Sequence, residues 1–225
     1  MNILAQWFPN VVHRLPEFID SFVQTLIMVA VTGVLSFMLS TVFAVGLTLT
    51  QRDGLAQQTV AFNVLDKLIN LFRSIPFIIL AAALVPFTRA LVGTAIGTKG
   101  AIFPLVVGIT PFFTRQIQSA LAGVDPGLIE AAESMGMSTS KIVYRIYLRE
   151  SVPSIIRVSV IAIVSLIGLT AIVGIVGGGS LGDFAIRYGY QRYMLDATYA
   201  TIIVLVMLIG VIEFVGRQLV ALTEH

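Results

Sequence analysis

The sequence predicts an all-α polytopic membrane protein, and its composition and the spacing of its charged residues are the observations that predict it. Of the 225 residues, 57% are hydrophobic and only 12% are charged, whereas an average soluble domain carries about 25% charged residues. Residues 21–51 and 158–182 contain no charged side chain. Because about 20 apolar residues in a helix cross a hydrocarbon core about 30 Å thick, each of these runs is long enough to span a bilayer.

Five transmembrane helices are predicted from the positions of the charged residues. Two of them need no special assumption, and the other three reach full length only if a flanking charged side chain snorkels or faces the protein interior. Pro76, Pro86, Pro104 and Pro111 fall inside predicted spans, where a proline removes a backbone hydrogen bond and predicts a kink. The expected spans are residues 20–49, 67–88, 100–122, 156–177 and 197–218.

The distribution of Lys and Arg predicts the orientation in the membrane. The longest polar connection, residues 125–153, contains Lys141, Arg145 and Arg149, and the positive-inside rule therefore places it in the cytoplasm. The N-terminus is then outside and the C-terminus is in the cytoplasm. The predicted parts are an extracytoplasmic interfacial lead-in (1–19), a transmembrane domain (20–220) and a cytoplasmic tail (221–225).

The 125–153 insert has the pattern of two short helices. Asp125 is a preferred N-cap residue, and Pro126 suits the first helical position. Gly136 predicts the end of this first helix, and Ser138 can cap a second helix that runs to about Glu150. Ala131 and Ala132, which lie in the first helix, would leave a smooth surface able to fit a groove.

Three interpretations of this insert remain open from the residues alone. A DNA-binding helix-turn-helix has a similar residue pattern, but the insert is tethered between two spans and lacks a hydrophobic core of its own. A helix pair lying passively on anionic lipid is a second interpretation, because Lys141, Arg145 and Arg149 form a basic stripe. A docking element for a cytoplasmic protein is the third and the favoured one.

The insert also resembles the EAA loop of ABC-importer permeases. The pattern consists of Glu130-Ala131-Ala132, then Gly136, then Ile146 and Leu148; Arg149 stands where the family usually has proline. Further stretches closely resemble the permease subunits of methionine importers, and together they cover about residues 20–220. These stretches are Phe72–Leu80, Pro86–Arg89, Val92–Gly97 and Gly177–Tyr190.

The resemblance implies the type I ABC-importer permease fold and a pore that two copies of this chain form in the bacterial cytoplasmic (inner) membrane. It implies two ATPase subunits beneath the pore, an extracytoplasmic substrate-binding (lipo)protein and contact with membrane lipid, but no nucleic acid. The partner ATPase would use ATP and Mg, and this chain would bind no cofactor. The chain lacks the phosphate-binding motif G-x-x-x-x-G-K-[ST]. The substrate would be methionine in its L or D form. The coupling residues would be Glu130, Ala131, Ala132, Glu133, Gly136 and Ser138.

Residues in the substrate path are predicted from position alone. The third and fourth spans should flank the path, which points to Pro111, Phe112 and Ser165. Arg115 lies in a predicted span, where an arginine needs a partner or a nearby interface. Glu213 and Arg217 are spaced to pair along one helix face.

An enzyme is a weak alternative. Gly178, Ser180 and Gly182 satisfy G-x-S-x-G, but a serine nucleophile needs a base, and the two histidines, His13 and His225, lie near the termini. We expect residues 177–182 to form a flexible external loop. The chain has no cysteine, and its acidic residues form no tight pair within a span, so no catalytic residue or metal ligand is expected. A secondary transporter or channel is the stronger alternative, because both also place kinked helices and charges in the bilayer.

Overall fold

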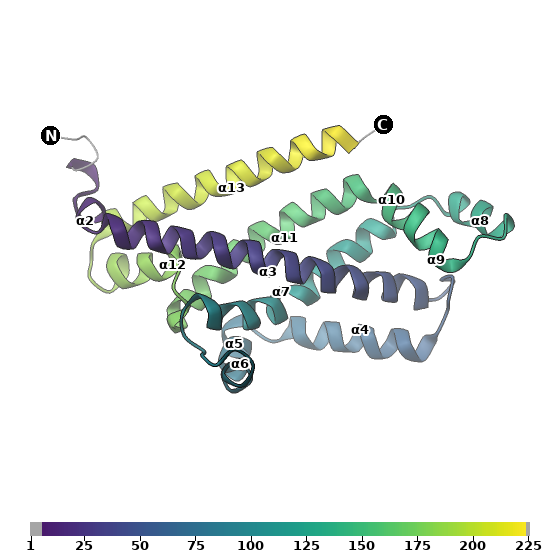
Figure 1. Ribbon diagram of the computed structural model, residues 1–225, viewed down its shortest axis with the longest axis horizontal. Helices are drawn as coiled ribbons and strands as arrows, with labels where there is room; N and C mark the ends of the chain where they lie inside the picture. The colour runs from purple at the N-terminus through teal and green to yellow at the C-terminus, as the bar shows by residue number, and fades with distance from the viewer. Residues whose placement is uncertain (1–5, 224–225) are drawn as a thin grey trace. The chain divides into compact units, whose positions relative to one another are not determined.

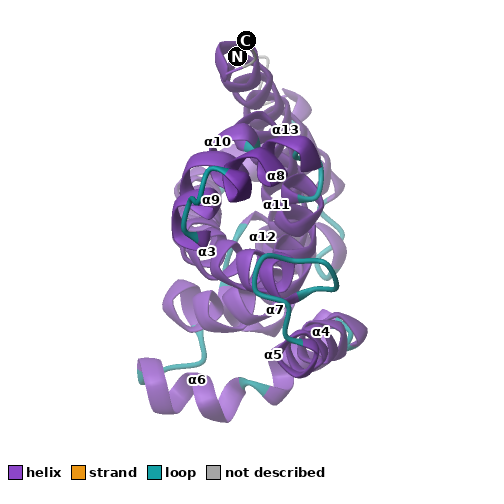
Figure 2. Cartoon of the chain, turned by 90° about the vertical axis from the view of Figure 1, so that its right-hand side faces the viewer, coloured by secondary structure: helices purple, strands orange, loops and turns teal. Residues whose placement is uncertain are grey.

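The computed structural model describes residues 6–223, apart from the side chains of residues 175 and 176, and in this range the chain consists of helices and loops (Figures 1 and 2). Residues 1–5 of the predicted lead-in and residues 224 and 225 of the predicted tail lie outside the described residues. The helices, with π-helical segments labelled η, are α2 (Pro9–His13), α3 (Leu15–Thr50), α4 (Thr59–Ser74), α5 (Phe77–Ala83), α6 (Val85–Val92), α7 (Gly97–Leu121), α8 (Pro126–Ser134), α9 (Thr139–Ile142), η1 (Val143–Tyr147), α10 (Leu148–Glu150), α11 (Val152–Val173), η2 (Gly174–Gly178), α12 (Leu181–Phe184), η3 (Ala185–Tyr190) and α13 (Leu195–Thr223).

Within the described residues, four helices are long and apolar enough to cross a membrane: α3, α7, α11 and α13. They coincide with four of the five predicted spans, and each begins before its predicted span. The helices α3 and α13 also end after their predicted spans, whereas α7 ends one residue early at Leu121 and α11, which matches the fourth span, ends at Val173. Residues 174–178, which the prediction joined to this fourth span, form the π-helical segment η2 instead. The prediction of an all-helical membrane protein is thus confirmed.

The prediction of a single, kinked span over residues 67–88 is wrong. The structure divides this region among α4, α5 and α6, none of which is long enough to cross a membrane alone. Ile75 is extended, with φ −84° and ψ 123°, because the ring of the following Pro76 disfavours the helical conformation in the preceding residue. By contrast, Pro104 and Pro111 are buried within α7 and do not interrupt it.

The chain forms two compact units, each assembled from three stretches of sequence. Unit 1 comprises Met1–Leu35, Pro76–Gly108 and Ile163–Ile212, and unit 2 comprises Ser36–Ile75, Ile109–Ala162 and Glu213–His225. A cluster around Phe184 and Tyr188 forms part of the core of unit 1. There the Phe18 and Phe184 rings meet edge to face with their centroids 5.1 Å apart, a favourable geometry for aromatic pairs.

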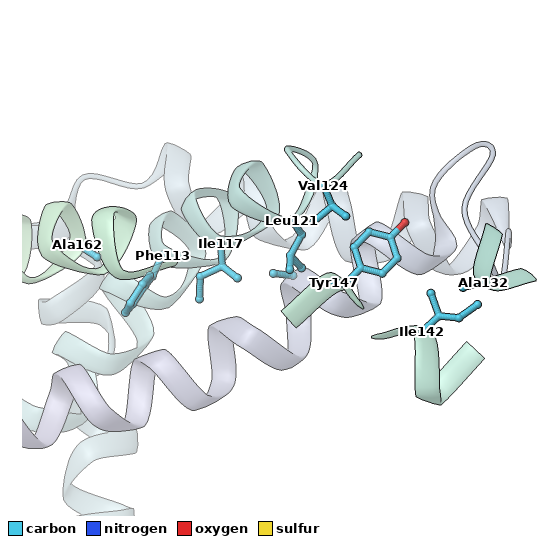
Figure 3. Packing of buried hydrophobic residues seen from close by; sticks show 9 residues of the cluster. Phe113, Ile117, Leu121, Val124, Ala132, Ile142, Tyr147 and Ala162 are labelled. Atoms are coloured by element: carbon cyan, nitrogen blue, oxygen red, sulfur yellow. The ribbon is translucent and has the colours of Figure 1, made fainter. Parts of the chain in front are cut away.

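The core of unit 2 runs along α7. Phe113, Ile117 and Leu121 follow one another at successive turns of α7, as Figure 3 shows. Each of them is at most 2% exposed. They belong to the same buried cluster as residues of α8, α9 and η1. The cluster therefore connects a membrane-spanning helix to the insert that follows it.

Candidate functional site

The first helix of the insert, α8, has well-defined ends. The Asp125 carboxylate accepts a hydrogen bond from the Gly127 N–H at 2.8 Å, as expected of an N-cap. At the other end Gly136 has φ +72°. Its N–H donates to the Glu133 carbonyl at 2.9 Å, and the Met137 N–H donates to the Ala132 carbonyl at 3.1 Å. This is the Schellman arrangement, so the predicted roles of Asp125 and Gly136 are confirmed.

The second predicted helix is present but is not a regular α-helix. Residues 139–150 are helical throughout, with a π-helical turn, η1, between α9 and α10. Ser138 occupies the N-cap position without a side-chain cap bond, and its hydroxyl lies 3.3 Å from that of Ser140. Lys141, Arg145 and Arg149 are all exposed.

The insert is attached through an apolar inner face. Ala132, Ile142 and Tyr147 are 0%, 1% and 8% exposed and belong to the buried cluster of unit 2 (Figure 3). Ile146 and Leu148, which carry the sequence resemblance, pack against the same cluster. Burial raises the pKa of the Tyr147 phenol, and the negative charge of Glu133 adds to this effect. The phenol therefore stays neutral at physiological pH.

The outer face of α8 consists of Leu128, Ala131 and Met135, which recur at helical spacing and are all exposed. Of the six predicted coupling residues, the structure exposes Glu130, Ala131, Glu133, Gly136 and Ser138 and buries Ala132 completely. Ala132 therefore fastens the insert to the core rather than contributing to a smooth outer surface.

Sequence reasoning missed the exposed apolar residues of the insert. Met135 is 73% exposed, Tyr144 is 77% exposed and Leu128 is 46% exposed. Part of the signal was available in the sequence, because Leu128, Ala131 and Met135 lie at i, i+3 and i+7 and form one apolar stripe. An exposed surface that offers large apolar side chains, with the carboxylates of Glu130 and Glu133 also exposed on the same helix, is suited to binding another protein.

Arg115 of α7 has a partner on α4, as its position in a span required. Its guanidinium forms an ion pair with Asp66 and donates a hydrogen bond to Asn70 Oδ1 at 3.1 Å and another to Gln118 Oε1 at 2.8 Å. The Asn70 amide in turn donates to Asp66 at 3.0 Å. This network joins α4 to the helix on which the insert is anchored. Asp66 and Asn70 were not predicted, although both lie on one face of α4.

The three predicted substrate-path residues differ in their surroundings. Pro111 is buried in α7, and Phe112 is half-buried against the hydrophobic cluster of unit 2. Ser165 is exposed on α11 and belongs to unit 1. The packing of Phe112 accounts for its apolar character without any ligand.

Ser180, the serine of the G-x-S-x-G string, is built into the structure of unit 1. It is 0% exposed with φ +103°. Its hydroxyl donates to the Thr170 carbonyl at 3.0 Å, and its N–H donates to Gln24 Oε1 at 3.3 Å. The prediction of a flexible loop at residues 177–182 is wrong, because Gly178, Leu181 and Gly182 are buried as well. The strand-turn-helix context of a catalytic serine is absent from the described residues.

Known proteins resemble the chain over all or most of its length. A probable D-methionine transport system permease protein, MetI, of Vibrio cholerae is 40% identical over 224 residues, which cover 100% of this chain and 98% of that protein. The methionine import system permease protein MetP of Bacillus subtilis is 37% identical, over 76% of this chain and 77% of that protein.

A solved structure matches the fold. A chain from the inward-facing MetNI methionine ABC transporter superimposes with a TM-score of 0.92 at 33% sequence identity, and the match covers 100% of both chains. Residues 45–224 match the family described as binding-protein-dependent transport system inner membrane component. The chain is therefore a member of this family of inner-membrane transport components.

Proposed function

We propose that this chain is the permease subunit of an ATP-driven methionine importer and that the outer face of α8 docks the ATPase. One observation carries the docking proposal: the insert is anchored by buried apolar side chains while Leu128, Ala131 and Met135 remain exposed beside them. The relatives that match the chain are named as methionine permeases. A permease supplies the path, and a partner supplies ATP hydrolysis.

The insert is built to transmit force. Its first helix is fixed at both ends by caps, and its inner face is part of the same cluster as α7. A pull on α8 therefore reaches α7 through close-packed side chains rather than through a loose connection. The network of Arg115, Asp66 and Asn70 carries the same movement to α4. Closure of an ATPase pair on bound ATP and Mg would in this way reorient the spans.

The working assembly would contain two copies of this chain, two ATPase subunits and an extracytoplasmic binding lipoprotein. The N-terminus would lie outside a bacterial inner membrane, and the C-terminus and the insert would lie in the cytoplasm, as the positive-inside rule predicts. A fifth span would come from the region of residues 67–88, which the structure divides among α4, α5 and α6.

The substrate path is proposed to pass Pro111, Phe112 and Ser165 on α7 and α11. Phe112 would act through packing that shapes the path, because it is half-buried in the core of unit 2. Replacing Phe112 by leucine should then alter the rate of uptake more than the apparent affinity for methionine. The choice between L- and D-methionine would be measured by competition in the same uptake assay.

Uptake of labelled methionine into proteoliposomes that contain the chain, its ATPase and its binding protein tests the proposal. Gly136→Pro and Glu130→Arg should uncouple ATP hydrolysis from uptake. Proline cannot adopt the φ of +72° found at Gly136, and arginine reverses a charge on the outer face. Gly136→Asn is the matched control, because asparagine tolerates this conformation, and it should retain most of the uptake.

The alternative, a secondary transporter or channel, makes the opposite prediction in the same vesicles. An ion-coupled carrier would lose uptake when ionophores collapse the ion gradients and would not need ATP. Uptake that persists without ATP, or that survives unchanged in both uncoupling variants, would contradict the importer proposal.

A further inference from the structure

Two adjoining clefts lie between the ends of α11 and α13 in unit 2. The first, of about 420 Å³, is lined by Arg157, Glu213, Gly216 and Arg217 among others. The second, of about 670 Å³, shares Arg157 and adds Arg149 and Glu150. No part of the proposed transport mechanism uses these residues. We propose that the clefts bind the phosphodiester headgroup of an anionic phospholipid.

The arginines lie at matching depths. Arg157 is five residues after the start of α11, and Arg217 is six residues before the end of α13. At about 1.5 Å per residue, both are about 8–9 Å from the helix ends. From Arg157 toward the C-terminal end of α11 there is no further charged residue. From Arg217 toward the N-terminal end of α13 the charged residues are Glu213 and then Asp196. The two guanidinium groups therefore mark the boundary between the apolar spans and the polar end of the protein, which is the level of lipid headgroups.

The apolar end of the first cleft is closed by close packing. A Cβ atom added to Gly216 would lie 2.3 Å from Val160 Cγ2, so α13 approaches α11 closely at this point. Val160, Val220 and Ala221 complete the lining, and Phe214 and Val215 are 55% and 48% exposed on α13 nearby. A headgroup phosphate in the cleft would thus have apolar surface beside it for the acyl chains.

The charges suit a monoanion. The clefts are lined by three arginines, Arg149, Arg157 and Arg217, and by two carboxylates, those of Glu150 and Glu213. The Arg217 guanidinium and the Glu213 carboxylate are 4.0 Å apart, with the side chains 70% and 49% exposed. Such an exposed pair is weak, so Arg217 can turn to a phosphate. Arginine binds phosphate through two parallel hydrogen bonds, and basic pockets between spans on the cytoplasmic side bind anionic headgroups.

Assignment to the cytoplasmic leaflet rests on the orientation in the proposed function. Native mass spectrometry of the assembled importer in detergent tests the site, with phosphatidylglycerol, phosphatidylcholine and inorganic phosphate as probes. We expect phosphatidylglycerol to be retained in preference to the other two. The double variant Arg157→Gln/Arg217→Gln should weaken its binding by about thirtyfold, as expected from the loss of two basic side chains near an anionic surface. Arg52→Gln, which removes an exposed arginine elsewhere in unit 2, should leave binding unchanged.

Three results would overturn the inference. They are equal retention of phosphatidylcholine, full displacement of the lipid by inorganic phosphate, and unchanged binding in the double variant. If the glutamine variant does not assemble, Arg157→Lys/Arg217→Lys decides instead, because it keeps the charge and should still prefer phosphatidylglycerol over phosphatidylcholine. The same spectra report bound ATPase separately, so a failed lipid site and a failed importer proposal give different results.

Discussion

Two of the regions of short helices that separate the long ones are fixed in different ways. In unit 1 the glycine-rich segment, residues 174–190, is held by directional bonds to α3. The Leu181 N–H donates to Thr25 Oγ1 at 2.9 Å, and the Tyr188 hydroxyl bonds to Glu17. In unit 2 the insert is held by buried apolar side chains on one side only, and its other side is exposed. Dense bonding in the first region fixes one conformation, whereas the second keeps a surface available for a partner.

The largest expected effect is the loss of the insert's anchor. Ile142→Ala should destabilise unit 2 by about 2–5 kcal/mol, because Ile142 is 1% exposed and truncation leaves a cavity. Tyr144→Ala, two residues away and 77% exposed, should change stability by less than about 0.5 kcal/mol. Thermal unfolding in detergent measures both. Similar values for the two variants would mean that the insert is not anchored through this face.

A somewhat smaller effect is expected in the glycine-rich segment. A Cβ atom added to Gly182 would lie 2.3 Å from the Cα of Ala171, so Gly182→Ala should cost about 1–3 kcal/mol through overpacking. Gly168→Ala is the matched control, because nothing lies within 4 Å of the added atom. The midpoints of thermal unfolding would separate the two variants. Equal unfolding midpoints would show that the segment rearranges to accommodate the added methyl group. That result would contradict the single fixed conformation inferred from its hydrogen bonds.

The ion pair that supports the insert's anchoring helix gives the next effect. Asp66→Asn leaves the Arg115 guanidinium without its counter-charge, and both side chains are less than a third exposed. We expect a loss of about 1–3 kcal/mol, together with slower ATP-driven uptake. Asp53→Asn, at an exposed turn position, should have no effect. A stable, fully active Asp66→Asn variant would remove this network from the account of coupling.

The smallest effect concerns the start of α8. Asp125→Ala removes the cap bond to Gly127 and should cost about 1 kcal/mol. Asp125→Asn should be nearly neutral, because asparagine caps equally well. Hydrogen exchange of the α8 amides would detect the difference. Faster exchange in the asparagine variant as well would mean that charge, rather than capping, holds the helix end.

Sequence alone was sufficient where one local rule decided the outcome. Apolar length identified α3, α7, α11 and α13, and capping preferences identified both ends of α8. A kink at Pro76 was also predicted, since proline removes a backbone hydrogen bond. The span over residues 67–88 was nevertheless expected to continue through the kink, and neither the proline nor the apolar composition reveals that the helix is interrupted there.

Long-range packing was beyond the reach of sequence patterns. The string from Gly178 to Gly182 suggested a flexible loop because glycines are permissive, but Gln24, Thr25 and Thr170 fix it from distant positions. The two adjacent alanines of the insert likewise looked equivalent, yet Ala131 is exposed and Ala132 is buried. Which side of α8 faces the core depends on α7, which local spacing does not reveal.

Native mass spectrometry of the chain purified with its ATPase tests the central claim, that the outer face of α8 docks the partner. Met135 is 73% exposed on this face, and Met135→Asp places a charge there without touching the buried cluster. We predict two ATPase subunits on a dimer of the unmodified chain and of Met135→Leu, and a dimer without ATPase for Met135→Asp. Full retention of the ATPase by Met135→Asp would contradict the claim.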